Sequence, residues 1–238
     1  MTELASQRPL PQEQILLQEL NHRVNNEFAT AISVVDLAAM ASSNDKVKGA
    51  LSRVADLLHR FADVHRALKM PEYDTPVDAA AYLRQLCRSI SRSQLDGRRI
   101  ELVLAAQPLQ LSADHCWRLG MIVFELINNA ARHAFPGWEG EIRVELLRAG
   151  AFAKCSVIDN GAAAPTVRPG RGLRIIDELS KSLGGRCIQK FEARGSRSIL
   201  AFPCHSELTV TAERPQRVVR ISERAPQTLV DSPSTVPC

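Results

Sequence analysis

One long run without glycine or proline decides how the chain begins to fold, and it reads QEQILLQELNHRVNNEFATAISVVDLAAMAS (residues 12–42). Apolar residues recur in it at spacings of three and four, which predicts an amphipathic helix with a heptad-like seam. A second seam follows the turn Ser43-Asn44-Asp45 and stops before Pro71. The sequence therefore predicts a helical hairpin over residues 12–72. Its two seams are Leu17, Leu20, Val24, Phe28, Ala31, Val35 and Ala38, then Val47, Leu51, Val54, Leu58, Phe61, Val64 and Leu68.

The hairpin has too little interior to be self-sufficient. Two helices share a single interface, so a lone hairpin cannot bury both seams well. A second copy related by a two-fold axis would cover them by forming a four-helix bundle. We therefore expect a homodimer held together by residues 12–72.

The following region, residues 76–205, mixes helical and strand patterns. This predicts an α+β fold, with an antiparallel or mixed sheet that carries helices on one face. Residues 206–238 are rich in Pro, Ser and Thr, which is typical of a disordered tail, with at most one short strand at Arg217–Ile221. The expected helices are 79–91, 112–134 and 171–183, and the expected strands are 99–105, 141–147, 152–159, 187–193 and 196–202.

Composition excludes several classes of protein. Hydrophobic residues make up 45% of the 238 and charged residues 24%, as in ordinary globular domains, and a net charge of +4 is too balanced to argue for nucleic acid. The sequence has neither the ~20-residue apolar run of a membrane span nor the apolar core of a signal peptide. Six scattered cysteines without a CxxC pair suggest reduced thiols rather than disulfides or zinc. We expect a cytoplasmic protein that binds neither nucleic acid nor membrane.

His22 is the first candidate for chemistry. At 100° per residue, it points about 160° away from the predicted seam, and Asn26 lies one turn further along the same face. An exposed imidazole can attack a phosphoryl group, and a neighbouring amide can orient the ring or the phosphate. A solvated surface histidine explains the position equally well.

A polar face on the helix of residues 112–134 is the second candidate. Glu125, Asn129 and His133 are four residues apart and share that face, while apolar residues occupy the other. A carboxylate and an amide one turn apart can position water and a hard cation such as Mg²⁺. A plain solvated helix face is the alternative.

Two glycine-containing turns complete the set of candidates. Asp159 and Gly161 end an apolar strand, where a carboxylate could accept a hydrogen bond from an exocyclic amine and glycine would admit a base. Gly170 and Gly172 open a helix, where backbone amides can approach phosphate. Each motif alone is explained as well by an ordinary turn.

In their order and spacing, these motifs resemble the sensor histidine kinase family, in particular the subgroup whose acceptor box reads His-Arg-Val-Lys-Asn. The corresponding stretch here, residues 19–26, reads ELNHRVNN. The resemblance implies a soluble two-component kinase that autophosphorylates His22, with catalytic help from Asn26. It also implies that residues 76–205 form an α/β-sandwich ATPase domain of the GHKL (Bergerat) type that binds ATP and Mg²⁺.

The resemblance also assigns roles to single residues. Asn129 would ligate Mg²⁺ and Glu125 would assist the transfer, because the two match the family's N box. The phosphoryl group would pass from His22 to an aspartate on the receiver domain of a response regulator. The remaining nucleotide-binding positions are Arg132 and His133 after the N box, Asp159 and Gly161 at the adenine site, and Gly170, Gly172 and Leu173 at the end of the ATP lid.

Departures from the family pattern leave two other functions open. Asn25 replaces the usual lysine of the acceptor box, Ala163 replaces the second glycine of the adenine motif, and only residues 162–169 form the lid. These changes favour a histidine phosphotransferase with a degenerate ATP-binding domain. A non-catalytic protein that sequesters a regulator is the third alternative.

Overall fold

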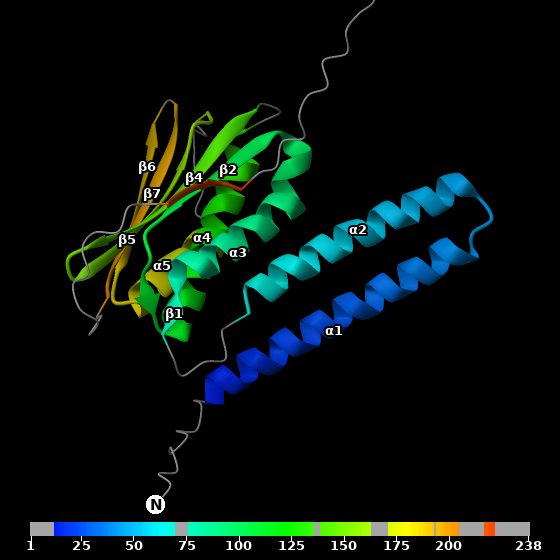
Figure 1. Cartoon of the computed structure of the whole chain (residues 1–238), viewed down its shortest axis with the longest axis horizontal. Helices are drawn as coiled ribbons and strands as arrows, with labels where there is room; N and C mark the ends of the chain where they lie inside the picture. Colours follow the sequence, from blue (N-terminus) through cyan, green and yellow to red (C-terminus); the bar gives the residue numbers. More distant parts are fainter. Residues whose placement is uncertain are drawn as a thin grey trace, which may run out of the picture.

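A long helical hairpin and a β-sheet backed by helices make up the chain (Figure 1). The computed structural model describes residues 12–69, 76–135, 139–162, 171–192, 194–204 and 217–221. The sheet is mixed, and helices cover one of its faces, so the predicted α+β architecture is present. Within the described residues, no helix is both long enough and apolar enough to cross a membrane.

The hairpin consists of α1 (Gln12–Ala41) and α2 (Asp45–Ala67). Asn44 starts α2, because its Oδ1 accepts hydrogen bonds from the backbone N–H groups of Lys46 and Val47 at 3.0 and 3.3 Å. Across the hairpin, the ring of Phe28 packs on that of His65 with centroids 5.2 Å apart. Burial at this contact lowers the pKa of His65.

The buried seam of α1 differs from the predicted one. Leu20 is 57% exposed, and Ala31 and Ala38 are exposed too, whereas Ile32 and Ala39 are buried. The reason is that α1 carries two lines of apolar residues, offset from each other by about one residue around the helix. The spacing pattern in the sequence combines residues of both lines into a single predicted seam. The side chain of Leu17 lies outside the described part. Val24, Phe28 and Val35 of the predicted seam are half-buried as expected. The positions that follow heptad spacing are Asn21, Asn25, Phe28, Ile32, Val35, Ala39 and Ser42, and Val24 is half-buried beside them.

The same correction applies to α2. Val47, Val54 and Phe61 were expected in the seam but are exposed, while Ala55 and Ala62 are buried. Each helix of the hairpin therefore presents a second apolar line that no described residue of the chain covers. This line includes Leu20, Ala31 and Ala38 on α1 and Val47, Val54 and Phe61 on α2.

Among the described residues, six strands form the main sheet, in the order β6-β7-β5-β4-β2-β8. Within these six, β2 and β4 are the one parallel pair, and α4 makes the crossover between them. A separate small ladder joins β1 (Val77–Asp78) to β3 (Gln110–Leu111). The main strands are β2 (Ile100–Ala106), β4 (Gly140–Ala149), β5 (Phe152–Asp159), β6 (Arg186–Glu192), β7 (Gly195–Pro203) and β8 (Arg217–Arg220).

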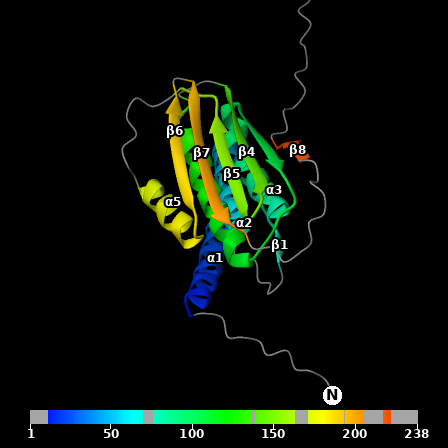
Figure 2. The same ribbon diagram turned by 90° about the vertical axis from the view of Figure 1, so that its left-hand side faces the viewer.

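Three helices cover one face of this sheet (Figure 2). Asp78 and Ser112 cap the first two, each with a side-chain oxygen that accepts a backbone N–H. The third ends at Ser182, and Gly184 shortly after it has a positive φ of 66° that suits glycine. The helices are α3 (Ala79–Ile90), α4 (Ala113–His133) and α5 (Arg171–Ser182), with a π-helical turn, η1 (Ser91–Leu95), and a 3-10 turn, η2 (Asp96–Arg98), after α3.

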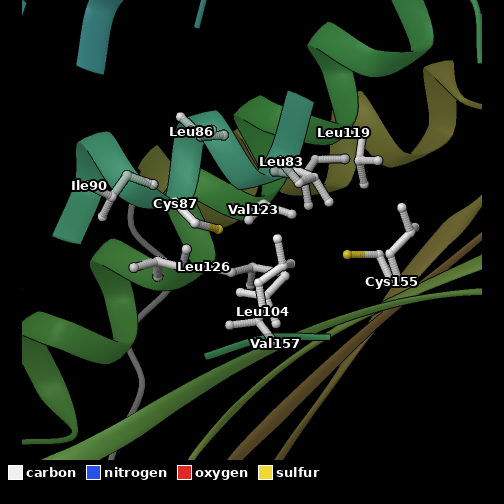
Figure 3. Packing of buried hydrophobic residues seen from close by; sticks show 14 of the residues in the cluster. Leu83, Leu86, Cys87, Ile90, Leu104, Leu119, Val123, Leu126, Cys155 and Val157 are labelled. Atoms are coloured by element: carbon white, nitrogen blue, oxygen red, sulfur yellow. The ribbon is translucent and has the colours of Figure 1, made fainter. Parts of the chain in front are cut away.

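The core lies between the sheet and α3 and α4 (Figure 3). Burying one aliphatic side chain of this size contributes about 1.5–3 kcal/mol. Residues of both layers meet there: Leu83, Leu86, Cys87, Ile90, Leu104, Leu119, Val123, Leu126, Cys155 and Val157.

The hairpin is attached to this core through the end of α2. Val64, Ala67 and Leu68 belong to the same buried cluster, and the Arg60 Nη1 donates to the carbonyl of Arg92 at 3.2 Å. The loop end of the hairpin projects away from the sheet (Figure 1). One end of α2 is thereby fixed, and the rest of the hairpin is left accessible.

The described cysteines are all free. Burial raises the pKa of Cys87 and Cys116 to about 12, so at neutral pH these thiols stay protonated.

The expected tail strand is present as β8, which pairs antiparallel with β2. Ile221, just after it, is buried in the core. The rest of the predicted tail and residues 70–75 lie outside the described residues.

Candidate active site

A polar stripe on α4 forms the floor of the candidate site. Glu125 and Asn129 are half-buried on this stripe, and His133 is exposed one turn later, beside the exposed Arg132. The other side of α4 is buried in the core, including Ile122 and Leu126, which fixes the rotation of the helix. The predicted sharing of one face by these polar residues is therefore present.

The start of α5 lies directly against this stripe. A Cβ added to Gly172 would lie 2.8 Å from Glu125 Oε2 and 3.7 Å from Asn129 Nδ2. Leu173 packs against the core and anchors this first turn. Glycine therefore lets the backbone at the start of α5 approach the carboxylate and amide closely. Gly170 lies outside the described residues.

The first N–H groups of a helix have no partner within it, and the helix dipole makes this end electropositive. Here that end faces a carboxylate and an amide. The combination offers donors for phosphate oxygens and oxygen ligands for a cation within one small region.

Asp159 occupies the end of β5 and is 5% exposed. Its Oδ1 accepts hydrogen bonds from the backbone N–H of Gly161 at 3.1 Å and of Ser196 at 3.3 Å. The hydroxyl of Ser196 donates to Oδ2. Gly195 makes this approach possible with a φ of 119°, since a Cβ there would lie 2.0 Å from the carbonyl oxygen of Asp159. These donors fix the carboxylate in one orientation.

The loop after Asp159 packs on the end of α4. A Cβ on Gly161 would lie 2.2 Å from the carbonyl oxygen of Ala134, and the N–H of Ala162 donates to that carbonyl at 2.9 Å. The α4 stripe therefore has the start of α5 at one end and the Asp159 loop at the other.

An open pocket of about 590 Å³ borders this loop. The pocket lies at the C-terminal end of α4, where Ala134 lines it. Glu125 and Asn129, further back along the stripe, do not line it. Its lining residues are Ala134, Phe135, Glu139, Asn160, Gly161, Ala162 and Arg194.

The hairpin presents the other predicted residues. His22 and Asn26 are both exposed on α1, one turn apart, and Arg23 beside them is held to Glu19 by an ion pair of 2.9 Å. Within the described residues, no hydrogen bond or ion pair joins His22 to the α4 stripe. The structure thus brings Glu125, Asn129 and Gly172 together and places His22 on a separate element.

Ser196 is a site residue to which the sequence assigned no role, although the pair Gly195-Ser196 is part of the resemblance to the kinase subgroup. It starts β7 immediately after Gly195, and only the pairing of β5 with β7 brings it opposite Asp159. A serine next to a glycine at the start of a strand is too common a pattern to reveal such a contact.

Comparison with known proteins supports one class. A family model described as a histidine kinase (HisKA_2) matches residues 19–94. The chain is 26% identical over 208 residues to the sensor histidine kinase PdtaS of Mycobacterium tuberculosis. This alignment covers 82% of the present chain and 41% of PdtaS. The chain thus spans about two fifths of the length of that relative.

Solved structures share the fold. The histidine kinase domain of the Erythrobacter litoralis EL346 blue-light activated histidine kinase superposes with a TM-score of 0.54 at 20% identity, covering 75% of this chain and 95% of that domain. Full-length ShkA in complex with AMPPNP gives a TM-score of 0.50 at 19% identity, covering 80% of this chain and 46% of ShkA. The chain therefore shares its fold with these histidine kinase domains.

Proposed function

We propose that this chain is a histidine kinase that transfers the γ-phosphoryl group of ATP to His22 and then to an aspartate of a response regulator. The observation that carries the proposal is the close approach of Gly172 to Glu125 and Asn129, where any larger side chain would force the carboxylate to move. The N-terminal end of a helix binds phosphate oxygens, and the adjacent carboxylate and amide supply oxygen ligands for a cation, so the arrangement suits a triphosphate with its cation. The similarity to a kinase solved with AMPPNP agrees with this use of the site.

The nucleotide would lie along the α4 stripe. Asp159, held by Ser196 and the N–H of Gly161, would accept a hydrogen bond from the exocyclic amine of adenine. Arg132 and His133 would flank the base and the phosphates from the last turn of α4. The glycines at 161, 170 and 172 would admit base and phosphates, with Leu173 holding the first turn of α5 in place.

Magnesium fits the donors of the stripe. Asn129 offers an amide oxygen, and Glu125 beside it offers carboxylate oxygens to orient water. No group of three His, Cys, Asp or Glu that could hold a metal exists among the described residues, so the ion would keep water and phosphate oxygens as its other ligands. When bound, Mg²⁺ neutralises phosphate charge; Asn129 would position it, and Glu125 would assist the transfer.

The transfer itself needs His22 as a nucleophile. A ring nitrogen of neutral His22 would form a bond to the γ-phosphorus while the bond to the leaving diphosphate oxygen breaks and ADP departs. Asn26, one turn away and also exposed, would orient the imidazole or a phosphate oxygen. Because His22 makes no described bond to the α4 stripe, transfer requires approach of the two parts, within one chain or between subunits.

The hairpin would form a four-helix bundle with a second copy. Leu20 and Val34 of α1 are 57% and 61% exposed, and Val54 and Leu57 of α2 are also exposed. These residues form the second apolar lines that the hairpin leaves uncovered, and burying them favours association. The receiver domain of the regulator would then dock on the remaining solvent face, near His22.

Dimerisation is testable by light scattering. We expect the wild-type chain to show twice the mass of one chain at micromolar concentration. The double substitution Val34→Glu with Leu57→Glu places carboxylates in the uncovered lines and should yield monomers. Ser52→Glu, at an exposed α2 position outside those lines, is the matched control and should remain dimeric. A wild-type monomer would contradict the bundle.

The function is tested by incubating the purified chain with γ-labelled ATP and Mg²⁺. Acid-labile, base-stable label on the chain supports the kinase. The alternative, a histidine phosphotransferase, is favoured by Ala163 and the short segment 162–169. It predicts no label from ATP but relay of a phosphoryl group from a phosphorylated regulator. Absence of label by both routes would leave regulator sequestration.

Asp159→Ala should weaken nucleotide binding. Loss of a hydrogen bond to a charged group corresponds to about a 10- to 100-fold rise in the ATP dissociation constant. Isothermal titration calorimetry measures this, with the melting temperature recorded because Ser196 also loses its acceptor. Asp177→Ala, an exposed acid on α5, is the control. An unchanged dissociation constant in a folded Asp159→Ala chain would remove the adenine role.

A further inference from the structure

The sheet face opposite the helices carries cations around two isoleucines, and we propose that it binds an acidic amphipathic helix of a partner protein. We call this patch the cationic face; it consists of Lys154, Arg186, Ile188, Lys190, Arg197 and Ile199. It lies on β5, β6 and β7, which stand side by side with the helices behind them (Figure 2). The proposal is independent of the kinase function.

The direction of these side chains follows from strand alternation. Leu200 and Cys155 are register partners and are buried in the core, so the residues next to them point to the opposite face. Ile188 and Ile199 pair directly across β6 and β7, and Ile188 is 48% exposed. No helix among the described residues covers this face.

The charges of the cationic face are unbalanced. Lys190 and Arg197 lie directly opposite each other across β6 and β7, an arrangement of like charges that destabilises a sheet. Neither side chain has an ion pair with a described residue. Towards the other edge the charges are matched, since Arg143 pairs with Glu141 at 2.8 Å. Glu192 on β6 and Glu145 on β4 are the acids that border the patch on the same side of the sheet, against four cations within it. The cations therefore outnumber the acids on β5 to β7, where an anionic partner would offset their repulsion.

The spacing of the cations suits a helix. Lys190 and Arg197 form one row, and Arg186 and Lys154 flank Ala201 in another row, four residues away along the strands. Four residues of strand span about 13–14 Å. The isoleucines lie between the rows, so a helix of ~10–12 Å diameter fits there with carboxylates reaching both rows.

The floor of the patch distinguishes this partner from others. Isoleucine is shorter than lysine and arginine, so Ile188 and Ile199 lie below the charged groups. A leucine from a helix can reach down to them, whereas a flat bilayer cannot. Phe152, 52% exposed, lies on the same side of β5 two residues from Lys154 and adds to the apolar floor. An acidic helix with one apolar stripe therefore matches the surface better than a flat bilayer, and binding of an oligonucleotide is one of the outcomes that the test separates.

The test uses the full chain and a designed peptide. A fluorescein-labelled helix of about 18 residues, or ~27 Å, carries leucines at i, i+3, i+4 and i+7 and glutamates on both flanks. We expect fluorescence anisotropy to show binding to the wild type. Lys190→Glu with Arg197→Glu should raise the dissociation constant at least about tenfold. Arg88→Glu with Arg98→Glu, two exposed arginines outside the patch, should leave it unchanged.

The single variant Lys190→Glu checks folding separately. It places a carboxylate opposite Arg197, so its melting temperature should equal or exceed that of the wild type. Equal peptide affinity of the wild type and the double variant would overturn the proposal. Capture of an oligonucleotide or of phosphatidylglycerol vesicles in place of the peptide would also overturn it, as would equal binding of a peptide with lysine for glutamate.

Discussion

His22→Gln should reduce labelling by γ-labelled ATP to background, a loss of at least about 1000-fold, because it removes the attacking atom itself. Glutamine keeps the polarity and approximate size of an exposed side chain. His22 is exposed on α1 and makes no described bond to the rest of the chain. We therefore expect the melting temperature and the nucleotide dissociation constant to stay at their wild-type values.

The hairpin supplies a matched control. His59 is also exposed, lies on α2 of the same hairpin, and can be changed to glutamine with equal ease. His59→Gln should label as the wild type does. Full labelling of His22→Gln, or loss of label in His59→Gln alone, would show that His22 is not the acceptor.

The existence of most elements could be predicted because each follows from local signals. The strand at Phe152–Asp159 has its predicted bounds, and the helix after Ser112 starts where its cap indicated. The predicted seam of α1 was wrong in part, because burial depends on which of the two apolar lines of this helix faces α2. That choice is made by packing between helices, and the position of Leu20 in the sequence carries no sign of it.

The same distinction applies to the candidate site. Glu125 and Asn129 could be identified because helix periodicity places them on one face. Their contact with Gly172 could not, since it depends on where α5 begins relative to α4. Ser196 was missed for a similar reason, because its approach to Asp159 is created by pairing of β5 with β7.

The attachment of the hairpin was also invisible to sequence patterns. Val64 and Leu68 continue the apolar line of α2, yet they are buried with the core of the α/β part rather than in a bundle. Among the described residues, the end of α2 therefore links the hairpin to the elements that would hold nucleotide. Movement of His22 towards the α4 stripe within one chain would have to disturb this packing, whereas transfer between subunits would not.

Asn129→Ala should abolish labelling while leaving the fold intact. Positioning of a catalytic metal ion contributes several kcal/mol to transition-state stabilisation, so we expect a loss of about 100-fold or more. Asn129 is half-buried on the polar stripe and not in the core cluster. Its loss should therefore change the melting temperature little. The assay is single-turnover labelling with γ-labelled ATP over a range of Mg²⁺ concentrations.

The metal dependence separates this role from a structural one. If Asn129 positions Mg²⁺, the alanine variant should need more Mg²⁺ for half-maximal residual labelling, whereas a merely weakened fold would lower the rate at every concentration. Gln85→Ala, which removes an exposed amide from the neighbouring helix α3, should match the wild type. Wild-type labelling by a folded Asn129→Ala chain would contradict the magnesium assignment, and with it the use of the Glu125–Asn129 stripe as the phosphate end of the site.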